Sequence, residues 1–177
     1  MIYSGATNND QEGNPLVEQD RNQQAAQLFC DALQNNYQGY DVSFNLGVLL
    51  QEGQIGVTDT ILSLVNQPGS GLKFKKDQRK QISAQFYCIA SQKDCKQALF
   101  NLGVMLDKEE IVVTDAILQL VKKSESGPKL NKDQPKKIAV QLYCIAAQKG
   151  FEQAFFNLGL MLDNGEIDVT DAIFKPF

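Results

Sequence analysis

The sequence predicts an all-α fold, a helical-repeat solenoid of three related units, and the main reason is an internal repeat. The segment FNLGVLLQEGQIGVTDTIL begins at Phe44, and similar segments begin at Phe100 and Phe156, 56 residues apart each time. A second block, DQRKQISAQFYCIASQKD in the middle copy, precedes each segment, and its apolar residues follow a helical period. Repetition at a fixed interval is typical of proteins whose units stack on their neighbours.

The repeat divides the chain into a leader and three units. We expect a flexible leader over residues 1–17 and units over residues 18–75, 76–131 and 132–177. The leader is polar, with neither a basic start nor an apolar run, so it does not read as a signal peptide. A cytoplasmic location is expected, and export into a host cell by a specialised secretion system is the alternative. No apolar stretch approaches the roughly 20 residues that span a bilayer, so no membrane insertion is expected.

The upstream block of each unit predicts its first helix. In the third copy Pro135 lies in the first turn, where its missing N–H costs nothing. The block ends at Asn36, Asp94 and Gly150 in the three copies. These residue types tolerate the left-handed conformation that ends many helices.

The FNLG segment predicts a second helix, and the sequence after it a short third one. Ala154, Leu158 and Met161 or Leu162 are expected to face inward. Glycine is unfavourable inside a helix, so Gly103 and Gly159 are expected where two helices come close.

Thr58, Thr114 and Thr170 each precede Asp and an apolar run, which is the pattern of an N-cap. The alternative interpretation of these Thr-Asp pairs is an acidic site.

The residues that catalysis would need are largely missing. The chain has no histidine, so it offers no imidazole base, no Ser–His or Cys–His pair and no common metal ligand set. We therefore predict no catalytic residue, no cofactor and no metal site, and a protein that is not an enzyme.

The cysteines have two interpretations. Cys30, Cys88 and Cys144 mark one repeat position and are expected to be core thiols in a reducing compartment. Cys95 falls outside the repeat, at a turn between Lys93 and Lys96, and is expected at the surface. The neighbouring lysines would lower the pKa of its thiol, so a reactive cysteine is the alternative.

Charge is unevenly distributed along the chain. Residues 72–149 carry fifteen basic and eight acidic side chains, whereas the segments on either side are acidic. This basic middle would either attract an acidic partner or simply solvate a helical surface. No aromatic or Arg-rich motif accompanies it, so nucleic-acid binding is not expected.

Residues 146–166, AAQKGFEQAFFNLGLMLDNGE, resemble the Sel1-like repeat, a relative of the tetratricopeptide repeat. The matching positions are Ala146, Ala147, Gly150, Ala154, Asn157, Leu158, Gly159 and Gly165. Tetratricopeptide repeats recur about every 34 residues, so the short third helix of each unit is interpreted as an insertion. Disulfide-bonded members of the family pair cysteines within a unit. The in-unit pair here, Cys88 and Cys95, is not repeated in the other units.

The resemblance implies a protein-binding scaffold whose partner is another protein: an adaptor, an inhibitor or immunity protein, or a secreted bacterial virulence factor. The alternatives are a small-molecule-binding or hydrolytic member of that family, or a fragment of a longer solenoid. The family register turns one face of each FNLG helix toward a concave groove. The expected groove residues are Phe44, Val48, Gln51, Phe100, Val104, Asp107, Phe156, Leu160 and Asp163. The competing interpretation is that the phenylalanines pack between helices.

Overall fold

The computed structural model describes residues 15–66, 73–122 and 130–167, and these residues form α-helices and no β-strand. The all-α prediction is confirmed. The leader falls outside the described residues, apart from residues 15–17, which begin the first helix. The helices are α1 (Pro15–Gln34), α2 (Asp41–Gln51), α3 (Asp59–Val65), α4 (Arg79–Gln92), α5 (Lys96–Asp107), α6 (Asp115–Lys122), α7 (Pro135–Gln148) and α8 (Glu152–Asp163).

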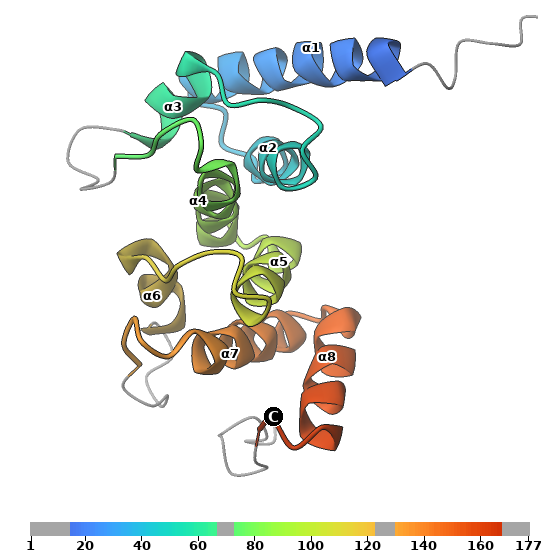
Figure 1. Cartoon of the computed structure of the whole chain (residues 1–177), viewed down its shortest axis with the longest axis vertical. Coiled ribbons are helices and arrows are strands. Elements are labelled where there is room, and N and C mark those ends of the chain that lie inside the picture. The colour runs from blue at the N-terminus through green and yellow to red at the C-terminus, as the bar shows by residue number, and fades with distance from the viewer. Residues whose placement is uncertain (1–14, 67–72, 123–129, 168–177) are drawn as a thin grey trace, which may run out of the picture.

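The longer helices follow one another along the long axis of the molecule, with α1 at one end and α8 at the other (Figure 1). The most extensive contacts join α2 with α4 and α5 with α7, that is, the second helix of one unit with the first helix of the next. The short helices lie to one side, α3 against α1 and α4, and α6 against α4 and α7. Each unit therefore packs against its neighbours. We call the contact between the second helix of one unit and the first helix of the next a joint.

The first helix of each unit ends as predicted. Asn36, Asp94 and Gly150 have φ angles of 60°, 73° and 75°, which place all three in the left-handed region. In the second unit, the N–H of the next residue, Cys95, donates to the carbonyl of Ala90 at 3.2 Å, which closes the helix end. This turn ends the first helix and leads into the second helix of the unit, which packs against the first.

The short helices begin at the predicted threonine caps. The Ile61 N–H donates to Thr58 Oγ1 at 3.2 Å, and the Ile117 N–H donates to Thr114 Oγ1 at 3.4 Å. Capping is therefore the role of these two threonines in the structure. The third threonine, Thr170, lies outside the described residues.

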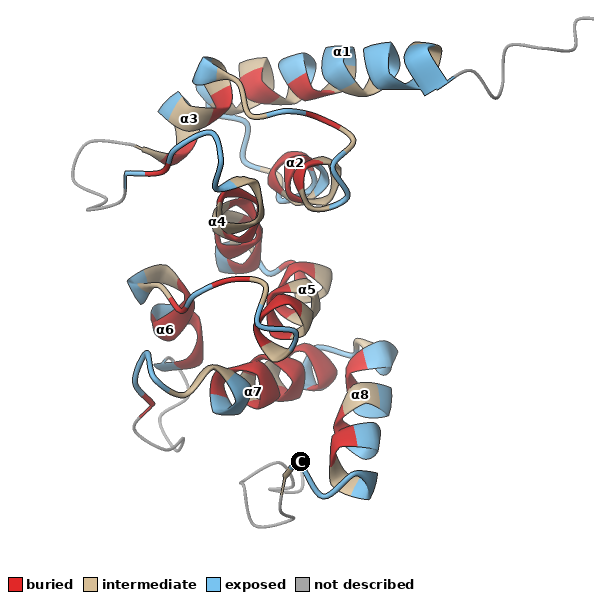
Figure 2. Cartoon of the chain, in the orientation of Figure 1, coloured by how far each residue is buried: buried red, intermediate tan, exposed pale blue. Residues whose placement is uncertain are grey.

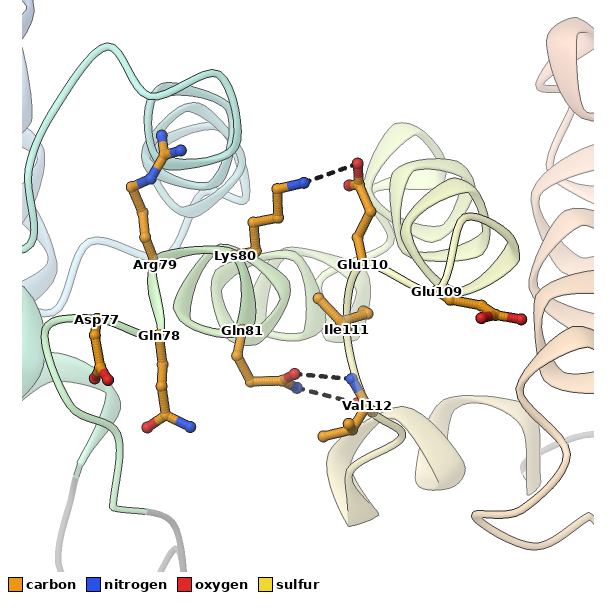
Figure 3. Close-up of a pocket in the computed structure, with 9 residues that line it drawn as sticks. All are labelled: Asp77, Gln78, Arg79, Lys80, Gln81, Glu109, Glu110, Ile111 and Val112. Carbon is orange, nitrogen blue, oxygen red and sulfur yellow. Dashed lines mark hydrogen bonds and ion pairs between the residues drawn. The ribbon is translucent and has the colours of Figure 1, made fainter.

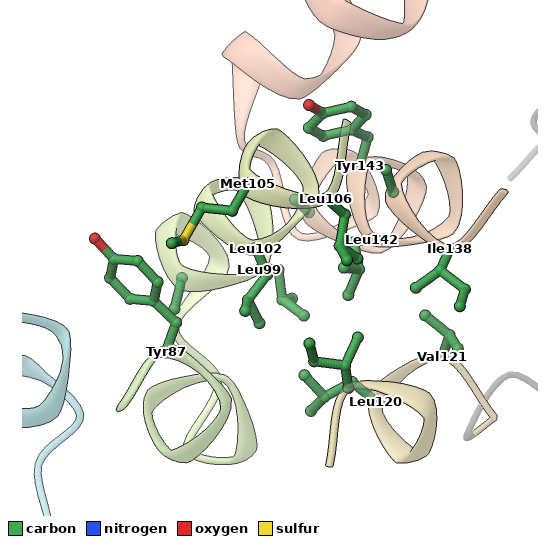
Figure 4. Close-up of a cluster of buried hydrophobic side chains, with 14 of the residues drawn as sticks. Tyr87, Leu99, Leu102, Met105, Leu106, Leu120, Val121, Ile138, Leu142 and Tyr143 are labelled. Atoms are coloured by element: carbon green, nitrogen blue, oxygen red, sulfur yellow. The ribbon is translucent and has the colours of Figure 1, made fainter. Parts of the chain in front are cut away.

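The buried side chains form two clusters. The smaller one joins the first unit to Ile82 and Phe86 of α4, and the larger one extends across the second and third units (Figure 4). The larger cluster joins α4 to α8 through leucines at each contact, among them Leu102, Leu106 and Leu142, none of which is exposed. Because α6 buries Leu120 and Val121 in the same cluster, this short helix is part of the hydrophobic core.

The three periodic cysteines are buried, as predicted, and all four thiols are free. Burial raises the pKa of Cys30 and Cys144 to about 11, with Asp31 also contributing at Cys30, and that of Cys88 to about 12.

The prediction of a surface thiol at Cys95 is wrong. Cys95 is 1% exposed, because the turn that ends α4 places its side chain in the larger cluster. Burial raises its pKa, although hydrogen bonds from the backbone of Ala98 and Gln97 act in the opposite direction. A buried thiol of raised pKa is a poor nucleophile, so the reactive interpretation loses its basis.

Alkaline pH is expected to destabilise the protein partly through Cys88. In the unfolded chain the thiol ionises near its ordinary pKa of 9.0, whereas in the folded protein it stays neutral until about pH 12. The pKa of the thiol is higher in the folded protein than in the unfolded chain. The stability that the thiol contributes is therefore complete below pH 9 and is lost as pH rises. Between pH 9 and 10 this thiol alone should remove about 1 kcal/mol of stability.

Urea unfolding at several pH values, compared between the parent and Cys88→Ala, checks this expectation. The variant starts less stable at pH 8 but should lose less stability on going to pH 10. Parallel loss in both proteins would contradict a neutral, buried Cys88.

Candidate functional site

The second helix of the first unit meets the next unit through an aromatic contact. The Phe44 ring on α2 lies against the Tyr87 ring on α4, with ring centroids 5.8 Å apart. Gly47 lets Tyr87 approach, since a Cβ at Gly47 would lie 2.6 Å from Tyr87 Cε1. The Tyr87 hydroxyl donates to Gln51 Oε1 at 2.6 Å. Three expected groove positions, Phe44, Gln51 and the intervening Val48, thus lie at or beside this joint and are only partly exposed.

At the same joint, two side chains of α4 form hydrogen bonds with the backbone of α2. The Ser83 hydroxyl donates to the Gly47 carbonyl at 2.6 Å, and Arg79 Nη1 donates to the Leu50 carbonyl at 2.7 Å. The second contact gives a second donor to a carbonyl at the end of α2, which also accepts from the Gly53 N–H at 3.2 Å. Arg79, Ser83 and Tyr87 follow one another at intervals of four residues, so they lie along one face of α4.

The second joint repeats the aromatic part of this arrangement. The Phe100 ring on α5 lies 5.6 Å from the Tyr143 ring on α7, and a Cβ at Gly103 would lie 2.6 Å from Tyr143 Cε1. Burial raises the pKa of Tyr143 to about 12, and the nearby Asp107 carboxylate adds to this rise. The Tyr143 hydroxyl therefore stays protonated at physiological pH. Val104 is half-buried and packs against the core cluster.

At α8 the same positions have no cover among the described residues. Phe156 is 67% exposed and Leu160 is 45% exposed, although their counterparts on α2 and α5 are partly buried. No atom lies within 4 Å of a Cβ added at Gly159. The prediction of a close approach at Gly159 is therefore wrong, because no tyrosine-bearing helix follows α8 in the described part of the chain.

Phe155, which was not among the predicted groove residues, extends this exposed face. Phe155 is 48% exposed, whereas Leu99 at the same repeat position is 2% exposed. Figure 2 shows this difference in burial along the molecule. Buried residues dominate the middle helices, and exposed residues are prominent on α1 and α8. We call the surface formed by Phe155, Phe156, Gly159 and Leu160 the α8 face.

The nine expected groove residues therefore do not form one continuous open strip. Those of α2 and α5 sit at joints within the chain, where Phe44 and Phe100 pack between helices as the competing interpretation held. On α8, Phe156, Leu160 and Asp163 remain exposed together. Tyr87 and Tyr143 cover the expected groove residues of α2 and α5, and they were not predicted to lie at these joints. Their recurrence one position before Cys88 and Cys144 is the signal that points to them.

A pocket of about 470 Å³ lies beside the start of α4 and the loop after α5 (Figure 3). Several of its polar groups are paired with one another across the pocket. Lys80 and Glu110 form an ion pair of 2.9 Å, and the Gln81 amide bonds both the N–H and the carbonyl of Val112 at 3.0 and 3.1 Å. These contacts fasten the loop to α4. The arrangement supports a structural role better than binding of a small molecule.

A second pocket of similar volume lies between the second and third units. Leu99, Leu120 and Ile145 contribute apolar walls, and Lys149 on its lining is paired with Asp94. This pocket also lies at a contact between units, and the two charged side chains on its lining form an ion pair with each other.

Other kinds of site find no support in the described residues. They contain no group of three or more histidines, cysteines or acidic side chains placed to hold a metal ion. No helix in the described ranges has the length and hydropathy to cross a bilayer.

Comparison with protein-family models, curated proteins and solved structures found no match in any of the three. The exposed α8 face is thus the feature of the described structure that most needs a functional explanation.

Proposed function

We propose that the protein is a non-catalytic, protein-binding scaffold in which the helical units stack as a short solenoid, and that the α8 face is its binding surface. One observation carries the proposal. The residues of this face are exposed on α8, while equivalent residues on α2 and α5 lie under the next helix. The face thus has the surface chemistry of a helix–helix joint without its second helix.

The composition of the face suits protein binding. Two phenylalanines and a leucine lie within one and a half turns, and aromatic side chains are enriched in the energetically important centres of interfaces. Full burial of such a side chain contributes roughly 1.5–3 kcal/mol relative to exposure. Glu152 and Asp163 at the two ends of α8 are exposed and supply a charged rim.

The inner joints indicate what kind of partner fits. At both joints the covering element is an α-helix that brings a tyrosine ring over a glycine. A helix carrying an aromatic residue is therefore the partner element that best matches the α8 face. The likeness of residues 146–166 to Sel1-like repeats agrees with such a role, since that family commonly acts through protein binding.

Replacing Phe156 and Leu160 together with glutamate is expected to weaken partner binding more than tenfold, about 1.4 kcal/mol. Both side chains are exposed in the chain itself, so the helical circular dichroism spectrum should be unchanged. The measurement is capture from lysate by the immobilised protein, with quantitative mass spectrometry of the bound proteins.

Val112→Glu is the matched control, because Val112 is apolar and 70% exposed but lies away from α8. A partner retained by the control and lost by the double variant supports the proposal. A partner that binds parent, control and double variant equally would place the binding surface elsewhere.

A further inference from the structure

The helix at the other end of the stack repeats the joint-forming pattern of α4. With Cys30 and Cys88 taken as equivalent, each α1 residue lies 58 positions before its α4 counterpart. The α1 counterparts of Arg79, Ser83, Phe86 and Tyr87 are Arg21, Ala25, Leu28 and Phe29. Arginine is kept, an aromatic ring is kept, and alanine at the serine position also occurs on α7 as Ala139.

This face of α1 is open in the described structure. Leu28 is 68% exposed, whereas Phe86 and Leu142 at the same repeat position are fully buried. Arg21 is exposed and Phe29 is half-buried. The chain thus carries an uncovered second-helix face at α8 and an uncovered first-helix face at α1, the two surfaces that meet at each inner joint.

The two inner joints differ at one position, and the difference indicates which kind of helix the α8 end accepts. At the first joint the Arg79 guanidinium fills the space next to Gly53, where a side chain would otherwise lie. At the second joint the glycine position holds Glu109 and the arginine position holds Pro135. A glycine thus faces an arginine, and a larger residue faces a proline.

The end of α8 is of the glycine type. Gly165 occupies this position with a φ of 69°, and nothing lies within 4 Å of a Cβ added there. Of the three first helices, α1 and α4 carry the arginine, and only α1 has an open face. Arg21 therefore matches the open space at Gly165.

We propose that α1 of a second copy of this chain packs on the α8 face, so that copies associate head to tail. The proposal rests on the proposed function of that face and names its partner. Phe29 of one copy covers Gly159 and Phe156 of the other, and Arg21 donates to the Leu162 carbonyl as Arg79 does to Leu50. Since the two surfaces differ, the contact is heterologous, and further copies extend the stack.

The chemistry of α1 makes this contact weaker than an inner joint. Phe29 lacks the hydroxyl that Tyr87 uses, and Gln24 stands where α4 has the buried Ile82. Acidic side chains also lie on both sides, among them Glu18 on α1 and Asp163 on α8. Association is therefore best measured at about 0.5 M salt, where the Debye length falls to about 4 Å and this repulsion is screened.

Sedimentation velocity of the full chain, from micromolar to several hundred micromolar, tests the proposal with two variants blocked at opposite ends. Leu28→Glu blocks the α1 face and Leu160→Glu blocks the α8 face, and neither side chain is buried. The parent should form dimers and longer species as concentration rises. Each variant alone should remain monomeric, and an equimolar mixture should form a one-to-one dimer that grows no further.

A third variant separates docking from folding. Gly159→Ala should leave the monomer folded, since its Cβ meets nothing, and should weaken association at least tenfold because the Cβ stands where Phe29 must lie. A parent that stays monomeric throughout overturns the proposal, and so does strong self-association of Leu28→Glu alone, which would mean an α8–α8 contact.

These outcomes are distinct from failure of the proposed function. A monomeric parent that still captures a foreign protein through Phe156 and Leu160 would overturn only the second-copy assignment. If capture also proved independent of these two residues, the α8 face would lose its proposed role as well.

Discussion

Leu142→Ala is expected to destabilise the protein by about 2–5 kcal/mol, whereas Leu28→Ala should change its stability by less than about 0.5 kcal/mol. The two leucines occupy the same position of the repeat, on α7 and α1. Leu142 is fully buried in the larger cluster (Figure 4), and its truncation leaves a cavity among packed side chains. Leu28 is 68% exposed, so its truncation removes little buried surface.

Urea unfolding followed by circular dichroism measures both effects. The measurement is made at low protein concentration, because self-association through α1 would add stability by mass action and penalise Leu28→Ala. Equal losses in the two variants would contradict the structure, since they would mean that the Leu28 side chain is covered in the monomer.

The helices and their ends could be predicted from the sequence because the signals that set them are local. A threonine caps a helix by bonding an N–H three residues later, as Thr58 and Thr114 do. A residue that tolerates positive φ ends a helix at its own position, as Asn36 and Asp94 do. Apolar periodicity acts over one or two turns. All of these are complete within a short stretch of sequence.

Exposure of the FNLG faces could not be predicted in this way, because it depends on what comes next. Phe100 and Phe156 have almost the same neighbours in sequence, yet one packs between rings and the other is 67% exposed. The difference arises from α7, which covers α5 and has no counterpart over α8 in the described residues. Repeat position therefore predicts the kind of contact that a residue makes but not whether the contact is made.

The burial of Cys95 is a second feature that the local sequence did not predict. Its place between a turn residue and a lysine is typical of a surface position, and the neighbouring Lys96 is in fact partly exposed. However, Cys95 is also the residue before α5, and its side chain turns inward with Leu99 and Ala98, which lie in the same cluster. The direction of one side chain at a tight turn follows from the packing of α4 against α5, which the sequence does not reveal.

Gly103→Ala and Gly159→Ala are expected to change stability in opposite directions, although they alter the same position of the repeat. Alanine favours a helix over glycine by about 1 kcal/mol at either place. At Gly103 the new Cβ would lie 2.6 Å from Cε1 and 2.9 Å from Cδ1 of the Tyr143 ring, which is 1% exposed and enclosed by the core. Overpacking of this kind typically costs about 1–3 kcal/mol, so a net loss of up to about 2 kcal/mol should remain. At Gly159 the Cβ meets nothing within 4 Å, and the helix gain should appear almost in full.

The two variants should therefore differ by about 1–3 kcal/mol, or roughly 2–12 °C in melting temperature for a chain of this size. Thermal unfolding at low protein concentration measures the difference, with the parent between the two variants. Gly47→Ala provides an independent check, because its Cβ would meet Tyr87 at 2.6 Å and it should behave like Gly103→Ala. If Gly159→Ala instead destabilised the dilute monomer as much as Gly103→Ala, a helix would have to cover the α8 face within the chain itself. The open end on which both proposals rest would then not exist.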